Sequence, residues 1–390
     1  MNKHSVHVLY CACVVVLLAA CIAPTATVET EGLSSEEFSG LIRDLSEEGG
    51  YFMSDNFTSS EDSYLTIADK LQELAVSGGA YIGVGPEQNF TYIARTRPRI
   101  AFIVDIRRQA MIQHLMYKAI FKLAPTRALF LSRLLSRPIP EAKAPGADAP
   151  LDEILAFFDN IPADNGTYAE NLAEIRKTIQ KDFQFPLSIE DQESLEYVYR
   201  SFRTWGFQIG YGGGERGGRR FGRFPNLRQL FGMRDLKGKQ GSFLASTKDY
   251  DFVRGMHNRN LIIPVAGDFS GKKALAAVGE YLRKRKIAVS VFYVSNVEIV
   301  LLDWGSYEQF SDFVKNVKKL PTDDRSLLLR STFAYYGPPA QLPEYQLCNF
   351  LQKVPVFLRE FDQGRTGAIA ALLEHPLSRL RDPEKIWPPL

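Results

Sequence analysis

A run of seven residues, Gly83-Val84-Gly85-Pro86-Glu87-Gln88-Asn89, could bind a ligand through its backbone. It follows a short apolar segment with the pattern of a strand and precedes a segment with the spacing of a helix. Glycines let the backbone approach a ligand, and a helix N-terminus offers free N–H groups. Asp105 lies 20 positions beyond Gly85, at the end of the next apolar segment, where a carboxylate can accept both hydroxyls of a ribose. The pattern predicts a nucleoside site containing Gly83, Gly85, Glu87, Asn89 and Asp105.

The third glycine of the dinucleotide-binding pattern G-x-G-x-x-G is missing, because its position is held by Gln88. A pyrophosphate needs the close approach that this glycine permits, whereas an adenosine ligand without phosphates, such as S-adenosylmethionine, tolerates a bulkier turn. The segment therefore favours S-adenosylmethionine over NAD. The alternative is that the two glycines and Asp105 only end the strands of a sheet that holds no cofactor.

The elements that would position these residues alternate between strand and helix. Residues 80–84 and 99–104 read as buried strands with a helix at 87–94 between them, which forces a parallel, right-handed pairing. Later strands are expected at 242–245, 261–266, 287–294 and 326–330, the last possibly antiparallel at an edge. Helices are expected at 34–48, 64–74, 111–135, 246–257, 272–285 and 307–317, and two more within 341–380. The predicted fold class is α/β, a Rossmann-like, mostly parallel sheet with helices on both faces and a long helical insertion.

The segment from Ala80 to Arg108 resembles the first two motifs of class I S-adenosylmethionine-dependent methyltransferases, and residues 241–303 are similar to their later strands. By this resemblance Gly83 and Gly85 would face the methionine part of the cofactor and Asp105 its ribose. Further binding residues would follow the strands at 261–266 and 287–294, at the same edge of the sheet: Asp268, Phe269, Ser295, Asn296 and Glu298. The long insertion and the lack of an Asn-Pro-Pro-Tyr-type segment depart from that family, so no catalytic residue is assigned. The body also resembles an uncharacterised bacterial family with Gly-Val-Gly-Pro-Glu-Gln-Asn-Phe and Ser-Asn-Val-Glu segments.

The N-terminal segment has the layout of an export signal. Lys3 precedes an apolar run at 8–20, which is shorter than the roughly 20 residues needed to cross a bilayer. Leu18-Ala19-Ala20-Cys21 closely resembles the bacterial lipobox, which implies removal of the signal and acylation of Cys21. Such a lipid anchor would hold the protein outside the cytoplasm, on the outer membrane because Ile22 rather than Asp follows the cysteine. A plain secretory signal is the alternative.

Composition and cysteine use exclude several classes. A formal net charge of +2 implies no general attraction to nucleic acid. Cys11 and Cys13 leave with the signal and Cys21 is lipidated, so Cys348 is the remaining thiol and no internal disulfide forms. No histidine that remains has ligands at metal-binding spacing, so no metal site is expected. A Gly-x-Ser-x-Gly nucleophile signal is also missing from the sequence.

A glycine-rich segment at 211–223 interleaves arginines with aromatic residues. Its glycines disfavour a stable helix, and arginines can bind phosphate or carboxylate groups. Two interpretations stay open: a loop over the ligand edge that binds an anion through Arg216, Arg219 and Arg220, or a plain solvated loop. RNA binding disagrees with export.

These patterns divide the chain into six parts. They are a signal at 1–20, a lipidated Cys with a flexible tether at 21–35, a first Rossmann-like part at 36–135, a helical insertion at 136–240, a second Rossmann-like part at 241–335 and a C-terminal helical segment at 336–390. The expected function is nucleoside binding by a membrane-anchored lipoprotein, with methyl transfer as the reaction that the resemblance implies. The competing interpretation is a non-catalytic cell-envelope interaction protein that uses the sheet as a scaffold.

Overall fold

One sheet runs through the chain between two layers of helices. The computed structural model describes residues 31–74, 77–140, 144–212, 224–333, 346–364 and 385–386. Its strands are β1 (Ala80–Gly83), β2 (Ile100–Asp105), β3 (Ile262–Ala266), β4 (Val289–Ser295), β5 (Leu327–Phe333), β6 (Leu347–Lys353) and β7 (Lys385–Ile386). Their order in the sheet is β3-β2-β1-β4-β5-β6-β7. The strands β1 to β5 pair in parallel, and β6 and β7 are antiparallel to their neighbours. The expected α/β class with a mostly parallel sheet is confirmed.

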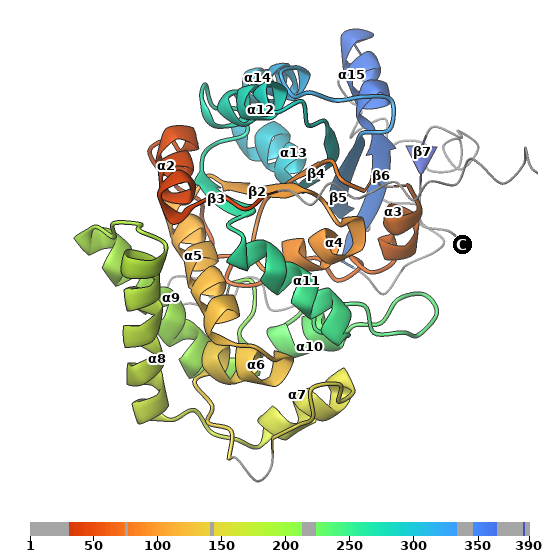
Figure 1. The fold of residues 1–390 in the computed structure, drawn as a ribbon. Coiled ribbons are helices and arrows are strands. Elements are labelled where there is room, and N and C mark those ends of the chain that lie inside the picture. The colour runs from red at the N-terminus through yellow and green to blue at the C-terminus, as the bar shows by residue number, and fades with distance from the viewer. Residues whose placement is uncertain are drawn as a thin grey trace, which may run out of the picture. The chain divides into compact units, whose positions relative to one another are not determined.

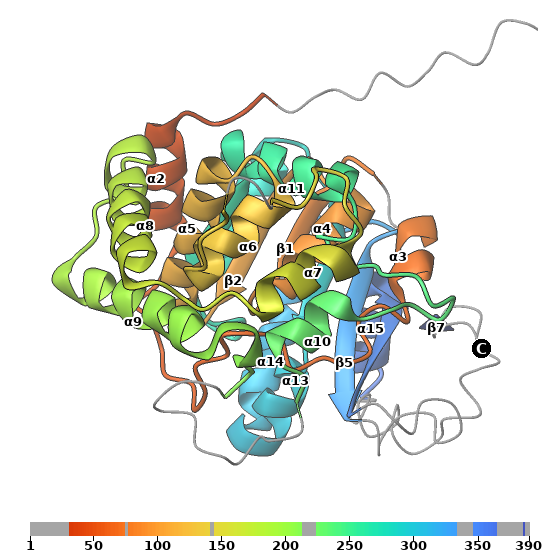
Figure 2. The ribbon, with the colours of Figure 1, turned by 90° about the horizontal axis from the view of Figure 1, so that it is seen from below.

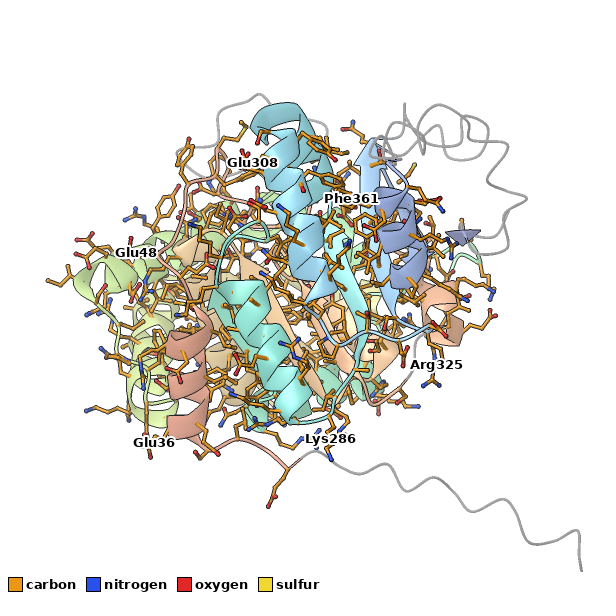
Figure 3. The ribbon with its side chains drawn as sticks, turned by 90° about the horizontal axis from the view of Figure 1, so that it is seen from above. Glu36, Glu48, Lys286, Glu308, Arg325 and Phe361 are labelled. Atoms are coloured by element: carbon orange, nitrogen blue, oxygen red, sulfur yellow. The ribbon has the colours of Figure 1, made fainter. Side chains whose placement is uncertain are left out.

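The central strands are apolar along their length because helices cover both faces of the sheet. Every residue of β1, β2 and β3 is buried. One face carries α4 (Gln88–Thr96), α5 (Arg108–Leu123) and α11 (Thr247–Asn258) (Figure 2). The opposite face carries α2 (Ser35–Leu45), α12 (Ala274–Lys284), α14 (Tyr307–Lys318) and α15 (Val354–Asp362), which lie together in Figure 3. The two layers are separated by the sheet in Figure 1.

Between β2 and β3 the chain runs through a mainly helical region. After α5 it forms α6 (Arg127–Leu135), α7 (Leu151–Asp159), α8 (Asn165–Lys177), the turn η2 (Thr178–Asp182), α9 (Ile189–Trp205), the turn η3 (Gly206–Gln208) and α10 (Leu227–Gly232). The long helix α9 packs beside α5, where the ring of Phe202 contacts those of Phe57 and Tyr117. The insertion is thereby joined to the layer that covers the sheet. Shorter elements complete the described chain: α3 (Ala68–Leu74), α13 (Val297–Ile299) and η5 (Val300–Gly305).

Several local expectations are wrong. The helix expected at 111–135 is two helices, because Pro125 follows Ala124 and interrupts the hydrogen-bond ladder. Residues 242–245 form a turn rather than a strand. The strand at 326–330 is β5, which pairs parallel with β4 and takes an inner position because β6 covers its other side. The described part of 341–380 holds the strand β6 before α15, where two helices were expected. Leu347–Lys353 is a strand because it pairs antiparallel with β5 along its whole length.

The described residues all belong to one compact unit, Glu31–Leu390. Within them no helix is both long enough and apolar enough to cross a membrane. The signal segment and Cys21 lie outside the described residues, as do Arg216, Arg219 and Arg220.

Candidate functional site

A pocket of about 170 Å³ opens at the carboxyl ends of the parallel strands β1 to β4. Because parallel strands end at one edge, the loops after β1, β2, β3 and β4 meet there. Six of the ten predicted cofactor-binding residues line this pocket: Gly85, Asp105, Asp268, Phe269, Ser295 and Asn296. The other four, Gly83, Glu87, Asn89 and Glu298, are not among its lining residues. The sequence pattern therefore located the edge, while side-chain direction decided which residues reach it.

The loop after β1 is shaped by Gly83, Gly85 and Asn89. A Cβ at Gly83 would lie 2.0 Å from Oδ1 of Asn89, so only glycine fits there. The Asn89 amide donates to the carbonyls of three loop residues, Val84, Gly85 and Pro86, at 2.8–3.0 Å. Gly85 has a φ of +76°, in the region that glycine adopts without strain. Gly83 and Asn89 thus hold the loop in shape, and Gly85 faces the pocket.

His114, on α5, contacts the same loop. Its Nε2 lies 2.9 Å from the carbonyl oxygen of Gly85, and the side chain is buried against the ring of Phe90. Burial lowers the pKa of His114 to about 4, so the imidazole is neutral near pH 7. A neutral imidazole with its proton on Nε2 donates to this carbonyl.

Glu87 and Glu298 are buried away from the pocket. Glu87 accepts a hydrogen bond from the backbone N–H of Ser59 at 3.3 Å, and burial raises the pKa of Glu87 to about 7. It lines a separate cavity of about 10 Å³ beside Tyr64. Glu298 forms a buried ion pair with Arg330, whose guanidinium donates to both carboxylate oxygens at 2.6 and 2.8 Å. Both carboxyl groups therefore bind other parts of the protein interior and do not face the pocket.

Asp105 lines the pocket, but it is not the open carboxylate that the sequence suggested. Asp105 is buried, with 5% of the residue exposed. Arg107 donates to Oδ1 from Nε at 3.0 Å and to Oδ2 from Nη2 at 2.8 Å, and its backbone N–H also donates to Oδ1 at 3.0 Å. Burial raises the pKa of Asp105, but the charge and hydrogen bonds of Arg107 outweigh it and leave this pKa below its usual value. Asp105 is therefore ionised and paired.

Arg107 also closes one wall of the pocket. Its Nη1 donates to the backbone carbonyls of Asp55 and Ser54, in the segment that precedes Thr58. The phenol of Tyr211 lines the same wall, and burial raises the pKa of Tyr211 to about 12. Arg107 thus links the end of β2 to a wall formed by a segment far from it in sequence.

The wall formed by Phe52, Asn56, Thr58, Ser59 and Ser60 was not predicted as part of the site. A signal was present, because residues 51–56 are an irregular stretch rich in side-chain hydrogen-bonding groups. The hydroxyl of Thr58 is fully buried and has no hydrogen-bond partner among the described residues. An unpaired buried hydroxyl is costly, so it favours a ligand that can pair with it.

The residue at the missing glycine position, Gln88, is buried in a polar network behind the pocket. Its Nε2 donates to Oε2 of Glu61 at 2.7 Å, and its Oε1 accepts from Ser59 at 2.5 Å. The Nε2 group also lies 2.9 Å from the hydroxyl of Tyr92. A side chain is needed at position 88 because it joins the wall to the sheet.

The charges on the pocket wall leave an excess of negative charge. Arg107 neutralises Asp105. Oδ1 of Asp268 accepts hydrogen bonds from the backbone N–H and the hydroxyl of Ser270, at 2.8 and 2.9 Å, and both of these donors are uncharged. Apolar side chains, Phe52, Ile106, Phe269 and Leu301 among them, supply much of the remaining surface. Within the described ranges no group of three His, Cys, Asp or Glu residues could hold a metal ion. The pocket suits a ligand with a flat apolar part and net positive charge.

The sequence matches the family described as a domain of unknown function (DUF7790) over residues 57–144 and 156–374, more than half of the chain. The chain belongs to this family. The matched ranges include the ends of β1 to β4 and every pocket-lining residue except Phe52 and Asn56. No curated protein matches the sequence significantly. Membership in the DUF7790 family therefore includes the pocket without assigning it an activity.

Proposed function

We propose that the pocket binds a nucleoside-containing ligand, with S-adenosylmethionine as the leading candidate and methyl transfer as the reaction it would serve. The observation that carries this proposal is the convergence of Gly85, Asp105, Phe269 and Ser295, at or just after the ends of four different strands, on one pocket. Ligands of open α/β sheets bind at this edge, and an acidic residue after the second strand is the usual partner of a ribose.

Hydrogen-bonding capacity supports a ribose at Asp105. Oδ1 already accepts two hydrogen bonds from Arg107, whereas Oδ2 accepts one. A carboxylate oxygen has two acceptor positions, so Oδ2 can accept one ribose hydroxyl without losing Arg107. The two-hydroxyl contact expected from the sequence is reduced to one.

Charge supports S-adenosylmethionine over a dinucleotide. S-adenosylmethionine carries a sulfonium and an ammonium against one carboxylate, and NAD carries a negative pyrophosphate. With Asp105 paired to Arg107, Asp268 is the lining carboxylate that has no ion pair with another described residue. A net negative wall attracts the cation and repels the pyrophosphate.

We also propose that the protein is a lipoprotein anchored through Cys21, outside the cytoplasm and on the outer membrane. The lipobox-like Leu18-Ala19-Ala20-Cys21 supports this proposal. The membrane would then be its partner through the acyl chains, while the nucleoside ligand would occupy the pocket.

Titration calorimetry of the chain from residue 30 onward tests the binding proposal. The parent should bind S-adenosylmethionine and S-adenosylhomocysteine and should bind NAD more weakly. Asp105→Asn removes one charge-assisted bond, worth about 1.5–3 kcal/mol, so affinity should fall roughly 10- to 150-fold. Glu298→Gln, outside the pocket, serves as the matched acid-to-amide control and should bind like the parent.

Two results would contradict the proposal in different ways. If the parent binds neither ligand at millimolar concentration, the cofactor proposal is wrong. That result would favour the competing interpretation, a non-catalytic cell-envelope interaction protein that uses the sheet as a scaffold. Binding that Asp105→Asn leaves unchanged would keep a ligand but move its ribose away from Asp105. Circular dichroism of each variant separates loss of binding from loss of folding.

A further inference from the structure

Ser295 stands at the end of β4 in a conformation that serine rarely adopts. Its φ is +52°, in the left-handed region, which strains a residue other than glycine. The pairing of β4 with β5 shifts register between Tyr293 and Ser295, and α13 begins two residues after Ser295. The turn therefore changes the direction of the chain at Ser295, which lines the pocket. Backbone strain of this kind concentrates at functional sites.

The hydroxyl of Ser295 donates to a fully buried carboxyl group. Its Oγ lies 2.5 Å from Oε1 of Glu61, at the short end of the range for a hydroxyl bonded to a carboxylate. The second oxygen of Glu61 accepts from Nε2 of Gln88 at 2.7 Å and from Nδ2 of Asn349. Glu61 does not line the pocket, and its hydrogen bond with Ser295, which does, links it to the ligand edge.

No cation neutralises Glu61 within the part of the chain that the structure describes. The titratable groups facing it are the phenols of Tyr81, Tyr92 and Tyr293, each with a pKa raised by burial. Burial also raises the pKa of Glu61, against the hydrogen bonds from Ser295 and its other neighbours. A buried carboxylate without a cation gains stability on taking up a proton, so Glu61 is suited to accept one.

We propose that Ser295 is a reactive serine and that Glu61 accepts its proton when the pocket holds an activated acyl or phosphoryl ester. A bond forms between Oγ and the electrophilic carbon or phosphorus, and the bond to the leaving group breaks. The leaving group departs with the electron pair of that bond, and the proton passes from Oγ to Oε1 of Glu61. This activity goes beyond nucleoside binding and does not depend on it.

The arrangement matches what a serine nucleophile needs. A strand, a strained turn residue and a helix follow one another at β4, Ser295 and α13, which is the local order that exposes the nucleophile of α/β-hydrolases. This strand–turn–helix order does not show as a motif in the sequence, because Tyr293 and Val297 stand where the Gly-x-Ser-x-Gly pattern has glycines.

The test is covalent labelling of the full chain with diisopropyl fluorophosphate, read by intact mass and peptide mapping. The parent should gain one diisopropylphosphoryl group on Ser295 with loss of fluoride. Its labelling rate should rise with pH as Glu61 loses its proton. Glu61→Gln still offers an oxygen to Ser295 but accepts no proton, so its rate should fall at least tenfold and lose the pH dependence.

Glu360→Gln provides the matched control. Glu360 is also a buried carboxyl bonded to a glutamine amide, Nε2 of Gln352 at 2.9 Å, but it lies on α15 outside the pocket. This variant should label at the parental rate. A parent that stays unlabelled, a label on another residue, or a Glu61→Gln rate equal to that of the parent would overturn the proposal. If Glu61→Gln does not fold, a parental rate that is independent of pH overturns it as well.

Discussion

Replacing Arg107 with methionine should leave the buried Asp105 carboxylate without the guanidinium that neutralises it. The two side chains are 8% and 6% exposed, and the guanidinium contacts both carboxylate oxygens. Breaking a buried pair in this way costs about 3–5 kcal/mol, because an uncompensated charge is left in the interior. Methionine keeps most of the apolar length of arginine, so the loss reports on charge rather than on volume.

An exposed pair of the same geometry supplies the control. Arg228 contacts both carboxylate oxygens of Asp159 at 3.1–3.3 Å, but the side chains are 29% and 41% exposed. Solvent screens such a pair, so Arg228→Met should cost about 1 kcal/mol or less. The difference between the two substitutions isolates the effect of burial.

Urea unfolding at pH 7, followed by circular dichroism, measures both variants. The double variant Arg107→Met with Asp105→Asn removes both charges and should be more stable than Arg107→Met alone. Because Arg107 lowers the pKa of Asp105, the stability from this pair is present above the unfolded pKa of about 3.9 and is lost as pH falls through the folded value. Equal costs for Arg107→Met and Arg228→Met, or a double variant less stable than the single one, would refute the reasoning.

Three further predictions concern the anchor, the loop after β1 and acid stability. Cys21→Ser should abolish metabolic labelling with palmitate and release the protein from membranes, and a variant that still labels would contradict the lipid anchor. Gly83→Ala would force its Cβ against Asn89 and should cost about 1–3 kcal/mol in thermal unfolding, whereas Gly255→Ala in α11, with open space around it, should stabilise by about 1 kcal/mol. Because burial lowers the pKa of His114 to about 4, the stability that its neutral form contributes should be fully present above about pH 6.5 and should fall toward pH 4. His114→Gln should flatten that fall in a pH series of unfolding curves. An unchanged slope would contradict this role of His114.

The sequence was sufficient to predict the strands β1 to β4 and the edge where the pocket lies. Apolar runs predicted β1, β2, β3 and β4, since a parallel strand buried on both faces has a nearly continuous apolar sequence. The rule that ligands bind at the carboxyl edge then predicted Gly85, Asp105, Asp268 and Ser295, all of which line the pocket. Glu87 and Glu298 were misplaced because spacing does not tell which side of a short turn a side chain faces.

The later strands show a second limit. Residues 326–330 and 347–353 carry no signal that fixes their place in the sheet, because pairing partners are distant in the chain. An edge position for β5 would follow if residues 347–353 were helical, because no strand would then pair with its outer side. Its inner position follows from the pairing of β6 along its whole length.

Local pattern alone determined the strands β1 to β5, most helices and the glycines of the turn, because each depends on neighbours a few residues away. Only the tertiary structure decided the chemistry of the edge. It placed the carbonyls of Ser54 and Asp55 against Arg107, which is paired with Asp105, and buried that ion pair. It also placed Glu61 behind Ser295, although 234 positions separate them in the chain. Charge and burial depend on such distant contacts, and for that reason the sequence could indicate where a ligand binds but not which groups act on it.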